Sequence, residues 1–176
     1  MADQTWNIDL AHSGIHFSVR HMVIAKVRGT FNKWSGSIVL DEANPKAARV
    51  EVKIDATSLD TAEDKRDTHL RSPDFFDTSK FGEILFKSKA VDAQGSHYKV
   101  TGDLTMHGVT REVTLEAERE GAGKDPWGND RLAFSARASL NRTDFGLKWN
   151  QALETGGLLV GEKVDFEIEV SAVRAK

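Results

Sequence analysis

The sequence predicts an all-β protein, built as a closed barrel or a sandwich of antiparallel strands. Apolar and polar residues alternate with period two through most of the chain, so that each strand has one buried and one solvated face. Turn signals such as Asn44-Pro45, Gln94-Gly95-Ser96 and His107-Gly108 separate the alternating runs, as hairpin connections require. One short stretch departs from this alternation and has the signals of a helix.

The expected strands follow one another along the chain. Alternation is clearest over residues 50–56, 98–104, 113–117, 132–140 and 164–172, and further strands are expected over 15–19, 27–31, 35–40 and 84–91. The apolar face is mostly Val, Ile, Leu and Phe, with small residues at Ala56, Gly102, Ala117, Ala136 and Ala138. An eight-stranded barrel is either filled by its side chains or holds one small ligand. Small inward residues favour a cavity; the alternative is that larger residues opposite them fill the space.

The helical stretch is predicted over residues 62–71. Asp60 or Thr61 is placed to cap its start in a capping box, and Asp67 and Arg71 form a favourable i,i+4 pair. Ser72-Pro73 ends the helix, and a short turn that carries two adjacent Phe residues follows. In an all-β chain, this interruption is the segment best suited to close or plug a barrel.

Composition narrows the functional classes. The 176 residues suggest one domain, and 39% hydrophobic with 29% charged residues indicate a folded chain. A net charge of −3 gives no electrostatic basis for binding nucleic acid. The absence of cysteine excludes disulfides, thiolate metal sites and cysteine nucleophiles.

Targeting signals are absent from the sequence as given. Met1-Ala2-Asp3-Gln4 leads directly into Trp6-Asn7-Ile8-Asp9-Leu10, with no basic and no apolar leader segment. No apolar run approaches the ~18 residues of a membrane span. The expected location is the cytoplasm, or the periplasm if a leader has been removed.

The sequence carries no convincing enzyme signature. The motifs G-x-S-x-G, H-E-x-x-H and G-x-G-x-x-G do not occur. The run from Gly156 to Lys163 resembles a phosphate loop, but Glu162 stands where the loop needs Lys, so it is interpreted as the turn into the last strand. We therefore expect a protein that is not an enzyme and has no catalytic residues.

Three histidines near the N-terminus raise the question of a metal site. His12 and His16 have helical spacing in a segment that alternates as a strand, and His21 shares the other face with Phe17, so convergence on a metal is not expected. His21 faces the apolar side. It is either a buried histidine bonded to a backbone or hydroxyl group, or a polar contact to the end of a ligand.

Two further segments leave alternatives open. Arg66, Asp67 and His69 could form a catalytic set or contact a ligand or partner, but anchoring of the helix on the barrel is the favoured interpretation. The segment 141–149, which carries Phe145 and Trp149, is either a gate at a barrel mouth or a structural corner held by Arg142 and Asp144.

Seven collinear segments resemble the YceI-like family of polyisoprenoid-binding proteins, over essentially the whole chain. They are Trp6-Asn7-Ile8-Asp9 with His12-Ser13, Phe17-Ser18-Val19-Arg20-His21-Met22, Val27-Arg28-Gly29-Thr30-Phe31, Ser58-Leu59-Asp60-Thr61, residues 66–77 (RDTHLRSPDFFD), residues 102–110 (GDLTMHGVT) and residues 141–147 (NRTDFGL). The resemblance implies a single domain over 1–176, an extended eight-stranded antiparallel lipocalin-like barrel with one short helix. It also implies a long apolar tunnel for a polyisoprenoid or another long amphiphile.

The function expected from this resemblance is the binding, storage or transport of a polyisoprenoid or isoprenoid-quinone-type lipid. An enzyme acting on such a lipid and a ligand-free structural or interaction barrel are the alternatives. We expect no cofactor or metal beyond the bound lipid, and a homodimer is possible. The side chains expected to contact the lipid are His21, Phe31, Phe75, Phe76, Ile84, Phe86, Leu104, Leu115, Phe134, Ala136, Phe145, Trp149 and Phe166.

Overall fold

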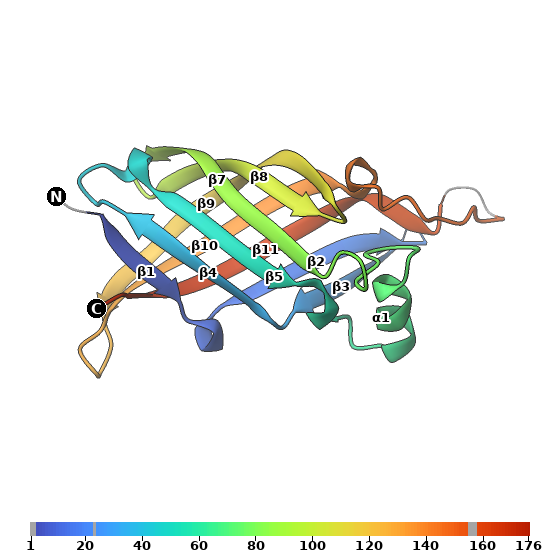
Figure 1. The fold of residues 1–176 in the computed structure, drawn as a ribbon, viewed down its shortest axis with the longest axis horizontal. Coiled ribbons are helices and arrows are strands. Elements are labelled where there is room, and N and C mark those ends of the chain that lie inside the picture. The colour runs from blue at the N-terminus through green and yellow to red at the C-terminus, as the bar shows by residue number, and fades with distance from the viewer. Residues whose placement is uncertain (1–2, 23, 155–157) are drawn as a thin grey trace.

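The protein is an elongated antiparallel β-barrel with one short α-helix at one end (Figure 1). This computed structural model describes residues 3–22, 24–154 and 158–176. The strands are β1 (Gln4–Ile8), β2 (Gly14–His21), β3 (Ala25–Phe31), β4 (Trp34–Leu40), β5 (Arg49–Asp55), β6 (Leu59–Asp60), β7 (Glu83–Gln94), β8 (His97–Met106), β9 (Val109–Lys124), β10 (Asp130–Asn141) and β11 (Val160–Arg174). The helix is α1 (Asp64–Arg71), and 3₁₀ turns form η1 (Leu10–His12), η2 (Pro45–Ala47), η3 (Ala56–Ser58) and η4 (Arg142–Phe145).

Hydrogen bonding closes the sheet into an eight-stranded barrel. Neighbours follow the order β1-β4-β5-β7-β8-β9-β10-β11, and β11 pairs back onto β1. The strands β1 and β2 lie end to end along β11, with Trp6 opposite Arg174 and Phe17 opposite Phe166. In the same way β4 pairs with β1 and β3 pairs with β2, so that the barrel is lengthened toward α1. Every pairing is antiparallel, which confirms the predicted barrel.

Each of the predicted strands is present, and several are longer than the alternation indicated. The strand β9 extends over 16 residues and β11 over 15, because both continue past the clean alternation into irregular pairing. The short strands β1 and β6 were not predicted. Ala56, predicted as the end of a strand, instead begins η3, where the Asp55 carboxylate accepts a hydrogen bond from the Thr57 N–H. Gly156 and Gly157 of the predicted turn before β11 lie outside the described residues.

The helix α1 begins two residues later than predicted, and its predicted local contacts are wrong. No side chain caps its start, since the Asp60 carboxylate accepts instead from the Ala62 N–H. Asp67 and Arg71 do not pair with each other. The buried Asp67 carboxylate accepts hydrogen bonds from Thr61, and Arg71 donates to the Leu59 carbonyl at 3.0 Å. The helix is therefore held by the segment that precedes it, because these contacts run outward from α1.

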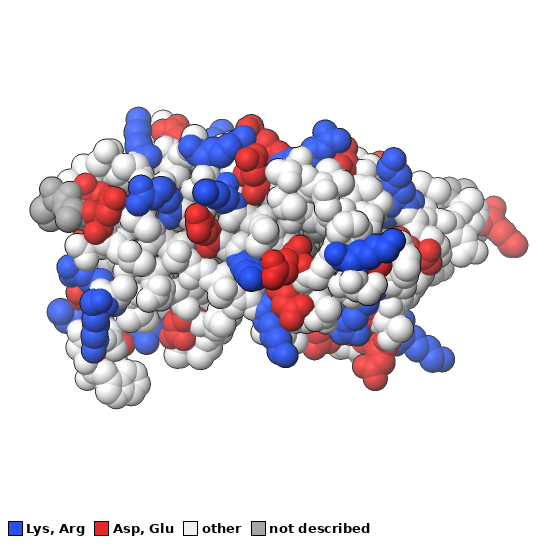
Figure 2. Space-filling view, viewed as in Figure 1, with Lys and Arg blue, Asp and Glu red and all other residues white. Residues whose placement is uncertain are grey.

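Charged side chains of both signs are interspersed over the face of the barrel wall in Figure 2. Most of their ion pairs are exposed, as in Lys53–Glu83 at 2.9 Å, and such pairs contribute ~0–1 kcal/mol each. Stability therefore comes chiefly from the interior, where the inward faces of the strands form the core. Within the described residues, no helix has the length and apolar character needed to cross a bilayer.

Candidate functional site

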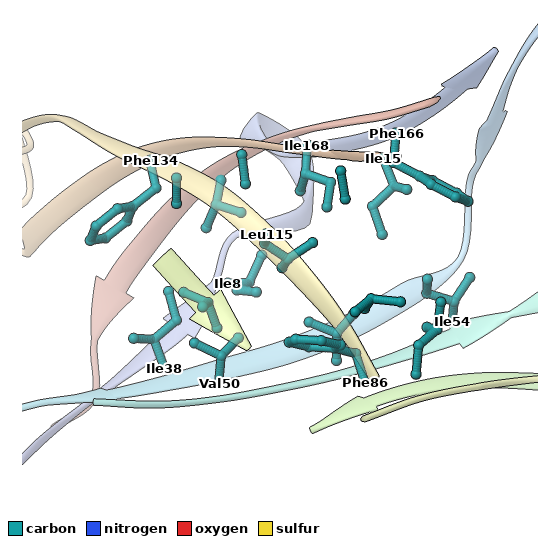
Figure 3. Close-up of a pocket in the computed structure, with 18 of the residues that line it drawn as sticks. Ile8, Ile15, Ile38, Val50, Ile54, Phe86, Leu115, Phe134, Phe166 and Ile168 are labelled. Carbon is teal, nitrogen blue, oxygen red and sulfur yellow. The ribbon is translucent and has the colours of Figure 1, made fainter. Parts of the chain in front are cut away.

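A cavity of about 150 Å³ lies in the barrel interior (Figure 3). Side chains from both sides of the barrel converge on it, among them Ile38 and Val50 on one side and Phe134 and Ile168 on the other. Of the described residues that line it, Trp34 and Tyr98 alone carry a side-chain nitrogen or oxygen, and all others are aliphatic, Phe or Met106. Apolar cavities of this kind stay free of water and take apolar ligands. We refer to it as the tail cavity.

The small inward residues predicted from the sequence divide into two groups. Ala117, Ala136 and Ala138 line the tail cavity, so they leave open space. Gly102 does not, because the ring of Phe86 occupies the space where its side chain would be, 2.6 Å from an added Cβ atom. Ala56 is fully buried in η3. Both sequence interpretations, open space and filling by larger neighbours, thus hold at different positions.

A second cavity of about 160 Å³ lies next to α1 and the turn that follows it. Its apolar lining includes Leu70, Phe75 and Phe76 from the helical segment, together with Trp149. The titratable groups in its lining are all basic, namely Arg20, His21, Arg66, His69 and Arg142. The surface that faces this cavity is nevertheless almost wholly apolar, with the basic residues at its margin. We refer to it as the helix-side cavity.

Four residues line both cavities and form the wall between them: Phe31, Met106, Leu140 and Phe166. Phe31 and Met106 are each 2% exposed, and Phe31 contacts the ring of Phe76 edge-on at 6.0 Å. Met106, one of the four, is unbranched and adaptable. The two cavities are therefore neighbours that share part of their lining.

The turn after α1 packs on the segment 141–149 through an aromatic cluster. The ring of Trp149 lies 4.7 Å from His69 and 5.4 Å from Phe75, and His69 lies 5.1 Å from Phe75. Contacts of this geometry contribute ~0.5–1.5 kcal/mol per aromatic pair beyond area burial. The cluster holds Phe75 at the helix-side cavity, which Phe76 also lines. Closure of the barrel by this segment remains a prediction.

Arg142 explains why the segment 141–149 is a rigid corner. Arg142 is 3% exposed, and its guanidinium donates to the carbonyls of Leu147 at 2.6 Å, Gly161 at 2.8 Å and Trp149 at 3.0 Å. Within the described part of the chain it has no ion pair with a carboxylate, and burial lowers its pKa below the usual value. The corner interpretation therefore holds for Arg142, while Trp149 at the end of the same segment lines the helix-side cavity.

The charged residues of α1 make contacts that hold the helix and the turn that follows it. The Asp67 carboxylate is 5% exposed and accepts from both the N–H and the hydroxyl of Thr61. Arg66 donates to the Thr61 carbonyl at 2.7 Å, and His69 bonds the Asp74 carboxylate at 2.9 Å. Because their polar atoms are engaged in holding the helix and its turn, these contacts support the anchoring interpretation.

The three N-terminal histidines point to different places. His12 bonds the Asp9 carboxylate at 2.8 Å, and His16 is exposed on the outer face of β2. His21 lines the helix-side cavity, as its place on the apolar face of the strand predicted. The structure therefore does not bring the three rings together.

The structure places twelve of the thirteen predicted contact residues on a cavity. The tail cavity is lined by Phe31, Ile84, Phe86, Leu104, Leu115, Phe134, Ala136 and Phe166, and the helix-side cavity by His21, Phe31, Phe75, Phe76, Trp149 and Phe166. Their contact with a ligand remains a prediction. Phe145 is a correction: it lies outside both linings and is 1% exposed, because η4 turns it into the core while its carbonyl accepts from His107.

Two wall residues, Met106 and Leu140, were missing from the predicted set. Met106 continues the inward alternation of Val100, Gly102 and Leu104 by one more step, so extending the strand by two residues would have found it. Leu140 lies at the end of the predicted strand 132–140 and faces inward with Ala136 and Ala138. Both were omitted because the alternation shows which face of a strand points inward but does not show where two cavities meet.

An elongated eight-stranded antiparallel barrel with apolar internal cavities places the protein in the class of lipocalin-like barrels. The chain belongs to the YceI-like family, because the model of the YceI-like domain matches residues 6–172. A Vibrio campbellii protein named UPF0312 protein is 44% identical over 174 residues, which cover 98% of this chain and 88% of that protein.

Solved structures share the fold. The crystal structure of Burkholderia cenocepacia BcnA matches with a TM-score of 0.82 at 24% identity, covering 93% of this chain and 98% of BcnA. A domain from Saccharophagus degradans, described as a polyisoprenoid binding domain, matches with a TM-score of 0.68 at 15% identity, covering 97% of this chain and 98% of that one. At these identities the likeness is one of fold.

Proposed function

We propose that this protein binds a polyisoprenoid or isoprenoid-quinone-type lipid and stores or transports it in the barrel. The observation that carries the proposal is the tail cavity, an internal space lined almost wholly by aliphatic and aromatic side chains. The Saccharophagus degradans domain that shares this fold is described as a polyisoprenoid binding domain. A branched hydrocarbon tail has no polar group to satisfy, so such a lining suits it. The helix-side cavity, with His21 and its other basic groups, suits the polar end.

The energetics favour a tail over a compact ligand. Each buried CH₂ contributes ~0.8 kcal/mol, so one five-carbon isoprene unit contributes roughly 4 kcal/mol before ordering costs. A dry cavity of about 150 Å³ holds a ligand the size of benzene, which is close to one isoprene unit. A tail of several units therefore has to displace the wall of Phe31, Met106, Leu140 and Phe166 and occupy both cavities.

Binding is proposed here in preference to catalysis. An enzyme acting on the lipid would need an acid or base free to meet the ligand, and the candidates on α1 are engaged. Asp67 is bonded to Thr61, and His69 is bonded to Asp74. These contacts support a role in anchoring the segment that closes the barrel.

The experiment that tests the proposal is identification of the bound lipid. Protein purified without detergent is examined by native mass spectrometry, then extracted with organic solvent and analysed for prenyl chains. We expect a stoichiometric lipid with a prenyl tail, and uptake of geranylgeraniol by protein stripped of lipid. Absence of a co-purified lipid together with no uptake of prenyl alcohols would overturn the proposal.

A further inference from the structure

The turn between β2 and β3 presents large apolar side chains to solvent. Ile24 is 87% exposed and Met22 is 49% exposed. The Met22 N–H donates to the Leu159 carbonyl at 2.8 Å, so the segment before β11 lies beside this turn and adds Leu158, which is 46% exposed. We call these three side chains the apolar tip. It lies at the α1 end of the barrel, away from the chain termini (Figure 1).

The hairpin behind the apolar tip is strongly basic. Residues 14–31 contain Arg20, Lys26 and Arg28 and no acidic residue, in a chain whose net charge is −3. Arg20 stands directly opposite Lys26 in the antiparallel pair, and Arg28 stands opposite Ser18. All three cations are exposed, and none forms an ion pair with a described carboxylate. Three carboxylates, Asp60, Asp165 and Glu167, line the same surface hollow as Lys26 and Arg28. Asp165 is engaged by Lys163 at 3.6 Å and by Ser139.

The same hairpin forms part of the helix-side cavity. His21 and Val27 line that cavity, each close in sequence to the apolar tip, and so does Leu159, which follows Leu158. The apolar tip is therefore continuous with the cavity proposed for the polar end of the lipid. A surface that covers the apolar tip would therefore lie next to the helix-side cavity.

We propose that the β2–β3 hairpin docks on the surface of an anionic lipid bilayer. Ile24, Met22 and Leu158 enter the boundary between headgroups and acyl chains, and Arg20, Lys26 and Arg28 meet the anionic headgroups. Apolar side chains at a tip with cations behind them are the arrangement of interfacial membrane binding. Docking would bring the helix-side cavity to the membrane for loading or release of lipid. That role rests on the proposed function, whereas the docking of the hairpin on a bilayer is independent of it.

The shape of this surface favours a bilayer over a protein partner. A stable protein interface buries about 800 Å² on each side, with a broad complementary core. Three apolar side chains on the end of a hairpin and an adjoining segment form a narrow tip instead. A bilayer accommodates such a tip without a complementary pocket, and its anionic lipids neutralise cations that have no carboxylate partner.

Docking is tested with lipid vesicles and the lipid-loaded protein as purified. Co-sedimentation is measured on vesicles of phosphatidylcholine alone and of phosphatidylcholine with phosphatidylglycerol. We expect binding to the anionic vesicles that weakens as salt is raised. Ile24→Ser should weaken it about tenfold, because a large apolar side chain no longer enters the bilayer. Lys26→Gln should weaken it about fivefold, and on anionic vesicles only.

Matched controls use exposed residues elsewhere on the molecule. Trp127 is 80% exposed in the turn between β9 and β10, at the end where the termini lie, and Trp127→Ser should leave vesicle binding unchanged. Lys46 lies in η2, and Lys46→Gln is the control for Lys26→Gln; it should also leave vesicle binding unchanged. No binding to either vesicle, or an equal loss with Trp127→Ser and Ile24→Ser, would overturn the docking proposal.

The test separates docking from lipid binding. The lipid carried by each variant is extracted and quantified alongside sedimentation. We expect Ile24→Ser to keep its lipid while it loses vesicle binding. A protein that binds vesicles through the tip but carries no prenyl lipid would contradict the proposed function and leave docking intact. A lipid-loaded protein that does not bind anionic vesicles would contradict docking and leave the proposed function intact.

Discussion

Filling the tail cavity from one position is the most direct test of how the barrel holds a lipid. Ala136 lies on β10 between Ala117 of β9 and Ile168 of β11, and its side chain lines the cavity. Ala136→Phe adds a phenyl ring at this point. A ring of that size fills an apolar cavity of 150 Å³, which is the volume of the tail cavity.

The expected effect is a selective loss of long ligands. Excluding one five-carbon unit removes roughly 4 kcal/mol of burial, which corresponds to roughly a thousandfold weaker binding. Geranylgeraniol, whose tail must occupy the tail cavity, should lose this affinity. Geraniol is short enough for the helix-side cavity and should be affected only slightly. The ring fills existing space, so any destabilisation should stay within the ~1–3 kcal/mol typical of overpacking.

The assay is isothermal titration of stripped protein with both alcohols, with thermal unfolding to confirm the fold. Ala133→Phe is the matched control, because Ala133 lies on the same strand with its side chain outside the cavity lining. It should bind both ligands as the parent does. A folded Ala136→Phe protein that retains full affinity for geranylgeraniol would refute the placement of the tail in this cavity.

Two further predictions concern the supports of the barrel. Burial opposes ionisation of Asp125, but hydrogen bonds from Arg131 and from neighbouring groups outweigh it and lower its pKa from 3.8 to about 2. Asp125 therefore stabilises the fold at neutral pH, and this contribution is lost as the pH falls from about 4 to 2. In urea unfolding at several pH values, Asp125→Asn should be less stable than the parent at pH 7 and equal to it below pH 2; a gap that does not change with pH would argue against this role. Asp67→Ala leaves the buried Thr61 N–H and hydroxyl without their acceptor and should cost ~1–3 kcal/mol in the same assay, whereas the exposed Asp64→Ala should cost much less.

The strand pattern was the most predictable part of this protein. Alternation at period two depends on one strand and its two faces, so residues 132–140 could be assigned from the sequence and are found within β10. The same pattern placed His21 and Ala136 on the inner side, and both line cavities. The strand β1 was missed because its few residues alternate only briefly, and it is held by pairing with β4 and β11.

Local rules failed where a long-range contact was stronger. The i,i+4 rule paired Asp67 with Arg71, a contribution of only ~0.2–0.5 kcal/mol. In the folded protein the buried Asp67 carboxylate needs hydrogen-bond donors, and Thr61 supplies them. Arg71 donates instead to the carbonyl of Leu59. Phe145 was predicted as a ligand contact from its place in a loop, but η4 turns it into the core.

By itself, the sequence determined the all-β class, the inward and outward faces, the position of the helical segment and the resemblance to the YceI-like family. These follow from periodicity and from residue types, which are properties of short segments. Only the tertiary structure decided that eight strands close, that two cavities exist and that Phe31, Met106, Leu140 and Phe166 divide them. Those features depend on side chains that meet across the barrel from strands far apart in sequence. Alternation along a single strand carries no information about how close such side chains come to one another.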